Sequence, residues 1–273
     1  MRRVILSRKG FDSSSGGGPS PILPDGRLVS LPIPSSDQDR YSSVLYDKGQ
    51  SLGDLMDALG YEAPPANCCH LDPDLVRLSK PREEGWRPNF GQRGSAQTHL
   101  ANGEVGVGDL FLFFGWYRRT TLVDGRPRWE RSAHRDWHVI YGYLEIGAVL
   151  RADDKAELPS WLADHPHAIG RRRKTANNTI YVASERLTLD PRYAGGGTFR
   201  YEDSLRLTKE GMSRTRWNLD PAVFKDVPMS FHTEAAWKDN YFQSTARGQE
   251  FVIHANDKVR GWVKSLFLAR PHC

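Results

Sequence analysis

Two long apolar segments in the middle of the chain constrain the fold most strongly. They read VGVGDLFLFFGWYR from Val105 and WHVIYGYLEIGAVL from Trp137. Both are rich in β-branched and aromatic residues, which favour strands, and a polar, arginine-rich stretch separates them. Segments of this kind predict two neighbouring strands in an antiparallel sheet or small barrel, joined by an excursion of the chain.

Shorter segments predict the elements around these strands. Leu52, Leu55, Met56 and Leu59 have helical spacing behind Ser51, and Asp54 completes a capping box. The other expected elements are strands or extended pieces, plus a final amphipathic helix: Arg3–Ser7, Arg27–Ile33, Thr179–Ala183, Leu205–Leu207 and Asp257–Phe267. No internal repeat and no long linker divides the chain. We therefore expect one α+β domain, residues 1–273, with a β-rich, barrel-like centre and a few peripheral helices.

Composition limits the cellular setting. No apolar run approaches the roughly 20 residues of a membrane span, and none near Met1 suits a signal peptide, so a cytoplasmic protein is expected. The three cysteines are Cys68, Cys69 and Cys273, an odd number without paired CxxC spacing, which predicts reduced thiols. A net charge of +5 is compatible with a polyanionic partner but is common among ordinary enzymes.

A glycine- and serine-rich stretch, KGFDSSSGGGPSPILPDG, follows the first expected strand. Glycine lets successive backbone N–H groups point into one concavity, and the side chains of Lys9, Ser13 and Ser14 add donors for an anion. Asp12 belongs to the same candidate binding loop. The stretch lacks the pattern of a nucleoside-triphosphate loop, because Pro19 and Pro21 follow it in place of a helix. A mobile Ser/Gly loop is the alternative.

The motif CCHLDPDL carries the first candidate catalytic and metal-binding residues. His70, Asp72 and Asp74 alternate, so in an extended segment their side chains share one face. An imidazole and two carboxylates on one face can hold a divalent metal such as iron or zinc, or act as general acid and base. In the other interpretation, the Asp-Pro-Asp sequence only caps a turn or a helix.

Two further polar stretches offer candidate residues. FGQRGSAQTHLANGEVGVGD, residues 90–109, is predicted to be a loop; it presents Gln92, Arg93 and Gln97 for substrate and His99 for acid–base chemistry or ligation, unless it is only a solvated connection. His165 and His167 alternate as a second candidate metal pair, without a third ligand in view. The RRRK run at 171–174 is either a solvated loop or a contact to nucleic acid.

Taken in order, several of these blocks resemble the third family of nucleotide-modification-associated domains. The blocks are VILSRKGFDSSSGGGPSPILPDGRLVSLPIP, HLDPDL, FGQRGSAQTHL, VGDLFLFFGWYR, HVIYGYLEIG, HPH and NNTIYVA, and they span nearly the whole chain. The resemblance implies a role in modifying DNA or nucleotides, and it implies that the polar residues in these blocks surround one pocket. It implies no particular reaction. The GDLFLFFG and IYGYLEIG strands also resemble those of PUA-like nucleic-acid-binding barrels.

Two hypotheses follow. In the first, the protein is an enzyme that acts on a nucleotide or a nucleic-acid base, with a metal or acid–base site built from the His and Asp residues. In the second, it is a non-catalytic reader of modified nucleic acid. Arginines between 118 and 135 then contact phosphates, and Trp116, Tyr117, Trp129 and Trp137 stack on bases.

Overall fold

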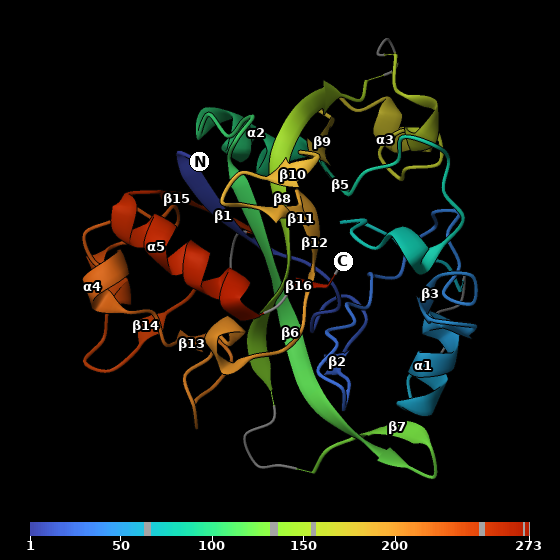
Figure 1. Ribbon diagram of the computed structural model, residues 1–273, viewed down its shortest axis with the longest axis horizontal. Coiled ribbons are helices and arrows are strands. Elements are labelled where there is room, and N and C mark those ends of the chain that lie inside the picture. The colour runs from blue at the N-terminus through green and yellow to red at the C-terminus, as the bar shows by residue number, and fades with distance from the viewer. Residues whose placement is uncertain (63–66, 132–135, 154–156, 246–248, 270, 273) are drawn as a thin grey trace.

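The structure is a computed structural model that describes residues 1–62, 67–131, 136–153, 157–245, 249–269 and 271–272. Cys273 and Arg135 lie outside these residues. The architecture is α+β, as expected, with a large mixed sheet at its centre and helices at its margins (Figure 1). Among the described helices, none is long and apolar enough to cross a membrane.

Ten strands of the described chain form the central sheet. Strand β6 pairs in parallel with β1 and β2, and every other pair in the sheet is antiparallel. The main path runs β15 (Glu250–His254), β1 (Arg3–Arg8), β6 (Leu110–Val123), β8 (Trp137–Arg151), β12 (Gly196–Phe199) and β16 (Pro271–His272). The branches are β2 (Ser20–Ile22) and β7 (Arg126–Trp129) on β6, β9 (Thr179–Ala183) on β8, and β5 (Asn89–Gln92) on β9.

The two predicted long strands are confirmed as β6 and β8. They pair from Leu110 opposite Glu145 to Tyr117 opposite Trp137. The excursion between them begins as a β-hairpin, because β6 continues into the arginine-rich stretch and turns back as β7. Asp124 and Gly125 form its two-residue turn, both with positive φ, as the common hairpin turn requires.

The sheet curls over one of its own faces. Past the irregularity between Ile146 and Ala148, β8 pairs with β9, and β9 in turn carries β5. The Phe90 ring of β5 lies 5.1 and 5.3 Å from the rings of Phe111 and Phe113 on β6. Among the described strands β5 has no second partner, so the expected barrel-like centre is a curled sheet and not a closed barrel.

Both predicted helices are confirmed. Helix α1 (Leu52–Ala58) has Ser51 and Asp54 in a reciprocal capping box, and α5 (Asp257–Leu266) is capped by Asn256. The remaining helices are α2 (Gly94–Asn102), α3 (Gly170–Arg173) and α4 (Pro221–Phe224). Three two-stranded ribbons complete the regular structure: β3 (Leu45–Asp47) with β4 (Gln50–Ser51), β10 (Arg186–Leu187) with β11 (Asp190–Ala194), and β13 (Arg216–Trp217) with β14 (Phe242–Gln243).

Three local predictions are wrong. Residues 90–109 are not one loop, because they contain most of β5 and all of α2. Only Gln97 and Leu100 of α2 are buried, so the sequence of this helix shows no apolar periodicity. Arg27–Ile33 makes only isolated bridges, and Leu205 ends a short 3-10 helix in place of a strand. In all three places tertiary contacts decide the conformation, and local propensity does not.

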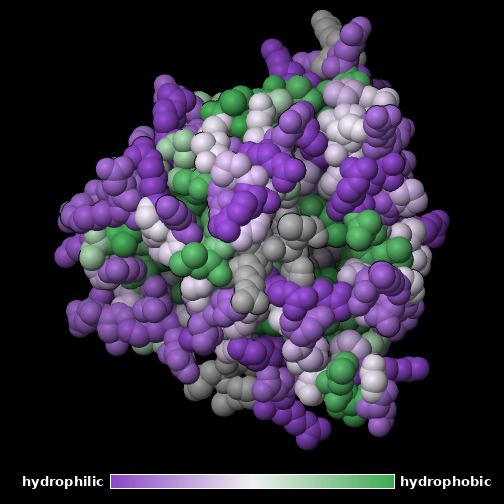
Figure 2. Space-filling model, in the orientation of Figure 1, coloured by the Kyte–Doolittle hydropathy of each residue, from purple (hydrophilic) through white to green (hydrophobic). Residues whose placement is uncertain are grey.

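The other face of the sheet carries an aromatic core beneath α5. Trp217 packs against Phe114 and Phe251, with ring centroids 5.2 and 6.0 Å apart. The buried residues Val259 and Val263 of α5 belong to the same hydrophobic core. On the molecular face seen in Figure 2, hydrophobic residues appear only as separate patches among hydrophilic ones, because the large apolar side chains lie inside.

A buried histidine in this core predicts a pH dependence of stability. His138 Nδ1 accepts a hydrogen bond of 3.1 Å from Trp217 Nε1, and burial, aided by the charges of Arg214 and Arg8, lowers the His138 pKa from 6.5 to about 3. Between these values the unfolded chain binds more protons, so the free energy of unfolding falls as the pH drops. We expect His138 to make the free energy of unfolding of the unaltered protein roughly 2 kcal/mol lower at pH 5 than at pH 7.

Chemical denaturation at pH 7 and pH 5 measures this difference. The His138→Gln variant keeps an acceptor for Trp217 but does not titrate, so its stability should fall less over the same range. Equal losses in the two proteins would contradict a neutral, buried His138.

Candidate functional site

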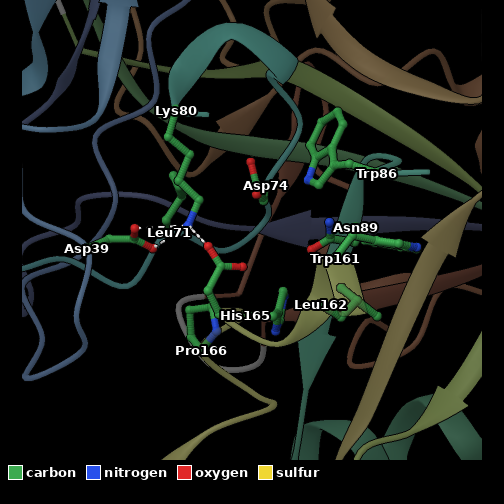
Figure 3. Close-up of a pocket in the computed structure, with 11 residues that line it drawn as sticks. Asp39, Leu71, Asp74, Lys80, Trp86, Asn89, Trp161, Leu162, His165 and Pro166 are labelled. Atoms are coloured by element: carbon green, nitrogen blue, oxygen red, sulfur yellow. Dashed lines mark hydrogen bonds and ion pairs between the residues drawn. The ribbon is translucent and has the colours of Figure 1, made fainter. Parts of the chain in front are cut away.

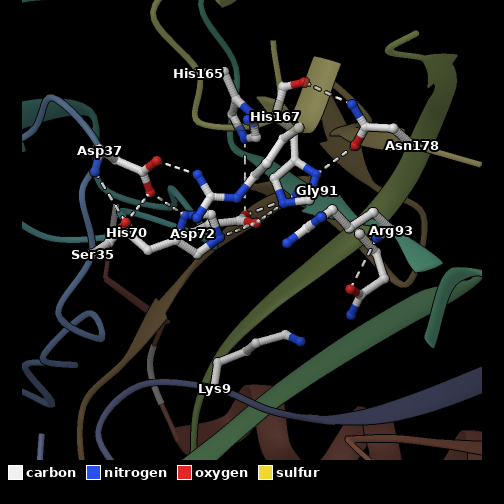
Figure 4. A network of polar contacts seen from close by, with 12 residues as sticks. Lys9, Ser35, Asp37, His70, Asp72, Gly91, Arg93, His165, His167 and Asn178 are labelled. Carbon is white, nitrogen blue, oxygen red and sulfur yellow. Dashed lines mark hydrogen bonds and ion pairs between the residues drawn. The ribbon is translucent and has the colours of Figure 1, made fainter. Parts of the chain in front are cut away.

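A cluster of three histidines and an aspartate lies where three segments of the chain meet (Figure 4). His70 and Asp72 precede the short 3-10 helix Arg77–Ser79, and His165 and His167 belong to the connection between β8 and α3. Backbone pairing of Asp74 with Asn89 fixes the first segment against β5. The sequence therefore brings together residues that lie about a hundred positions apart.

His70 is oriented by a carboxylate that the sequence analysis did not identify. Its Nδ1 lies 2.7 Å from Asp37 Oδ2, and because a carboxylate only accepts, Nδ1 carries the proton. Ser35 and Arg172 also donate to Asp37. In the neutral ring, the Nε2 lone pair of His70 therefore faces Asp72 Oδ2, 3.5 Å away.

His167 is oriented in the same way by an amide. Asn178 Nδ2 donates to the carbonyl oxygens of Ala152 and His167, which fixes the amide group with Oδ1 as its free acceptor. His167 Nδ1 donates to this oxygen over 2.6 Å. Its Nε2 lone pair is therefore directed at Asp72 Oδ2, 3.4 Å away.

Three electron-pair donors thus converge. In the neutral rings, no hydrogen lies between either imidazole Nε2 and the Asp72 oxygen. The donor atoms of His70, Asp72 and His167 all lie within 4.8 Å of one another. The site is enclosed, with side-chain exposures of 14% for His70, 2% for Asp72 and 4% for His167. Facing acceptors repel unless a cation lies among them, so the arrangement suits either a proton on His70 or a metal ion.

The pKa values of the cluster reflect burial and mutual charge. Burial lowers the pKa of His167 to about 4, against the opposing charge of Asp72, so His167 is neutral near pH 7. Burial also acts to lower the pKa of His70, but hydrogen bonds with Asp37 and Asp72 outweigh it and raise the pKa. Burial favours a protonated Asp72, yet the contact with His70 and the neighbouring histidines lower its pKa.

Each of the three donor residues His70, Asp72 and His167 has a hydrogen-bond partner outside the cluster. Asp37 holds His70, Asn178 holds His167, and the Gly91 N–H donates to Asp72 Oδ1 over 2.8 Å. Gly91 is also the floor of the site, since a Cβ at this position would lie 2.4 Å from His167 Cδ2. Outer partners of this kind are typical of metal-binding histidines and carboxylates.

The other predicted metal and catalytic residues lie apart from these three donors. Asp74 forms a two-pronged ion pair with Arg82, both bonds being 2.6 Å, and burial raises its pKa to about 6. His99 contacts Ser230 Oγ at 3.0 Å from helix α2. His165 is the exception, because its Nε2 lies 3.9 Å from Asp72 Oδ1, and burial lowers its pKa to about 3.

Three of the predicted substrate-binding residues form hydrogen bonds inside the protein. Lys9 and Gln92 both donate to Glu250 Oε1 over 2.7 Å, and Gln97 accepts from the Tyr181 hydroxyl. Glu250 is buried, and its Oε2 has no hydrogen-bond partner within the residues that the structure describes. In Figure 4 the Arg93 side chain extends toward the histidine cluster, and Lys9 lies below the cluster.

The glycine- and serine-rich loop is closed on itself. Asp12 Oδ1 accepts from the backbone N–H groups of Ser14 and Ser15 and from the Ser14 hydroxyl. Ser13 accepts a hydrogen bond from Arg214. Two of the amides that could have bound an anion are therefore already paired within the loop.

A small cleft adjoins the cluster on the far side of His165 (Figure 3). Lys80 bridges Asp39 and Asp164 there, with N–O distances of 3.0 and 2.7 Å. This bridge ties the segment that carries Asp37 to the loop that carries His165 and His167. Asn89 lines the same cleft, and its Oδ1 has no hydrogen-bond partner among the residues described.

Sequence reasoning missed Asp37, Asn178, Gly91 and Glu250 as members of the site. None belongs to a spaced motif, although Gly91 and Asn178 lie in the FGQRGSAQTHL and NNTIYVA blocks that carry the family resemblance. Arg172 was assigned only to a basic run, whereas it donates to Asp37. The outer partners of a site become visible only when the fold brings the segments together.

Fold and site together define a class: an α+β protein with an enclosed His/Asp cluster between a curled sheet and its flanking loops. Residues 3–254 match the model of the family described as nucleotide modification associated domain 3. The chain belongs to this family, as its sequence blocks indicated, and the family description associates it with nucleotide modification. Neither the curated proteins nor the solved structures that we compared gave a match.

Proposed function

We propose that this protein is an enzyme that modifies a nucleotide or a nucleic-acid base, with one divalent metal ion, such as iron or zinc, held by His70, Asp72 and His167. The single observation that carries the proposal is the convergence of two oriented imidazole lone pairs on one carboxylate oxygen. Three protein ligands leave further coordination positions open, as in catalytic metal sites and unlike closed structural ones.

The outer hydrogen bonds support a metal more strongly than the three ligands alone do. Asp37 and Asn178 each fix the ring tautomer that leaves Nε2 free to ligate. If the cluster served only to hold a buried proton, one imidazole beside Asp72 would suffice. A second neutral imidazole with its lone pair on the same oxygen is explained by a cation of higher charge.

Lys9, Gln92 and Arg93 are the residues we propose for binding substrate beside the metal. Lys9 is fixed by Glu250, while Arg93 is exposed and forms no ion pair with any described carboxylate. A guanidinium in this position suits a phosphate or another anionic group of a nucleotide. A metal beside it can polarise a substrate oxygen or activate a water molecule.

The arrangement of the aromatic residues favours an enzyme over a reader of modified bases. The Arg214 guanidinium lies 3.7 Å from the centre of the Trp116 ring, and Arg118 and Arg119 lie 5.4 and 5.5 Å from the Trp129 and Trp137 rings. These ring faces are occupied by the chain's own arginines. A base could stack on them only by displacing a cation–π contact.

Mass spectrometry of nucleosides tests the proposed function. The purified protein is incubated with nucleotides or single-stranded DNA and with Fe²⁺, Mn²⁺, Zn²⁺ or Co²⁺. The products are digested to nucleosides, and the nucleoside masses are measured. We expect a metal-dependent mass change in one nucleoside, which the Asp72→Ala variant reduces by at least about 100-fold because a ligand is lost.

The matched control is His99→Ala, which removes a histidine outside the cluster and should keep most of the activity. A mass change that is independent of added metal and survives in Asp72→Ala would refute the metal-dependent mechanism. Salt-sensitive DNA binding without any mass change would favour the reader.

A further inference from the structure

His165 carries a buried N–H group that donates a hydrogen bond to no acceptor among the described residues. Its Nδ1 accepts a hydrogen bond of 3.0 Å from the backbone N–H of His167, so in the neutral ring the proton resides on Nε2. The side chain is only 3% exposed, and Nε2 has no hydrogen-bond partner in the described part of the chain. Buried donors are rarely left unpaired in folded proteins, which points to a partner from outside the chain.

The same tautomer excludes His165 from the set of metal ligands. A ligating Nε2 needs its lone pair, but here that nitrogen holds the proton. Asp72 Oδ1 lies 3.9 Å from this nitrogen, beyond hydrogen-bonding distance, and already accepts from Gly91. His165 therefore differs in kind from His70 and His167, although all three lie beside Asp72.

The direction of this N–H group is toward the candidate metal site. Figure 4 shows the His165 ring with its Nε2 directed at Asp72, while the Arg93 side chain extends toward the same cluster. The N–H group of His165 and the cationic side chain of the exposed residue Arg93 thus both lie beside the candidate metal site. A ligand that satisfies them presents oxygen acceptors and carries negative charge.

We propose that His165 is a fixed hydrogen-bond donor to an oxyanion, the oxygen of a phosphate-type group, which binds beside the metal at His70, Asp72 and His167. This inference rests on the proposed function and names the chemistry of its ligand. His165 is thereby a substrate-binding residue, and it is not a third imidazole ligand.

Two variants separate the donor from the rest of the ring. In His165→Asn, the short amide can still accept from the His167 N–H but does not reach the Nε2 position. In His165→Gln, the longer amide places an N–H₂ group near the Nε2 position. The variants thus differ in the distal donor, and both retain a polar side chain in the buried site.

The experiment titrates inorganic phosphate into the Co²⁺-loaded protein and follows the visible absorbance of Co²⁺. We expect all three proteins to bind Co²⁺ with similar affinity. Loss of a hydrogen bond to a charged oxygen should weaken phosphate binding by about 10-fold or more in His165→Asn, with much of it retained in His165→Gln.

Several results would overturn the inference. Equal phosphate affinity in the unaltered protein and His165→Asn would show that the N–H does not bind the oxyanion. It would then donate to a water molecule in the adjacent cleft that also contacts Asn89. Loss of Co²⁺ from His165→Asn alone would make His165 a ligand, and a Co²⁺ spectrum insensitive to phosphate would remove the oxyanion site. An unaltered protein that binds no Co²⁺ would instead refute the proposed metal centre itself.

A second measurement needs no variant. In the Zn²⁺-loaded protein, the ¹⁵N NMR signal of His165 should report a proton on Nε2, and this proton should shift when phosphate is added. A proton on Nδ1, or an Nε2–H signal that phosphate leaves unchanged, would contradict the assignment.

Discussion

Replacement of His167 by alanine is expected to weaken binding of a divalent metal by at least about 100-fold, since loss of an outer partner alone commonly costs 10- to 100-fold. The variant removes the Nε2 atom that lies 3.4 Å from Asp72 Oδ2. It leaves only His70 and Asp72 as ligands from the set of three. A Co²⁺ titration, followed by absorbance or calorimetry, measures the affinity.

Two controls make this result interpretable. His99→Ala removes a histidine of helix α2 that contacts Ser230 and lies outside the set of three, so its metal affinity should be unchanged. Thermal unfolding with a chelator present shows whether each variant is folded. A folded His167→Ala protein that binds Co²⁺ as tightly as the unaltered protein would exclude His167 as a ligand.

The second large effect is expected at Gly91, where the chain passes directly beneath the cluster. A Cβ on this residue would lie 2.4 and 2.5 Å from two atoms of the His167 ring and 2.9 Å from His165 Cε1. All three atoms belong to rings held in a buried site, so they have little room to move. We expect Gly91→Ala to lower the free energy of unfolding by roughly 1–3 kcal/mol and to weaken metal binding sharply.

Chemical denaturation and the Co²⁺ titration measure these two effects. Gly106→Ala is the matched control, because a Cβ there meets no atom within 4 Å. Gly91→Ala is compared with this control in both quantities. Equal unfolding free energies and equal metal affinities would show that the His167 ring does not pack against the backbone at Gly91.

Most of the framework could be predicted from the sequence because its signals are local. The paired strands β6 and β8 follow from long apolar runs, and α1 follows from its apolar spacing and the Ser51 capping box. Helix α2 could not be predicted in the same way. Its burial depends on Gln97, which accepts from Tyr181 of β9, a strand about eighty residues later in the chain.

The candidate site was predictable only in part, for a related reason. Alternation placed His70, Asp72 and Asp74 on one expected face, but Arg82 pairs with Asp74 and separates it from the cluster. His167 takes the third position from a segment far along the sequence. Asp37 and Asn178 carry no motif, because their role is defined by the rings that they orient and not by their sequence neighbours.

The most direct test of the metal centre is anomalous diffraction from a crystal of the Co²⁺-loaded protein. We predict one anomalous peak among His70 Nε2, Asp72 Oδ2 and His167 Nε2, at distances of about 2.0–2.2 Å. His165 should lie outside the coordination sphere. A peak at another place on the chain, or no peak between these three atoms at saturating Co²⁺, would contradict the assignment of the metal site.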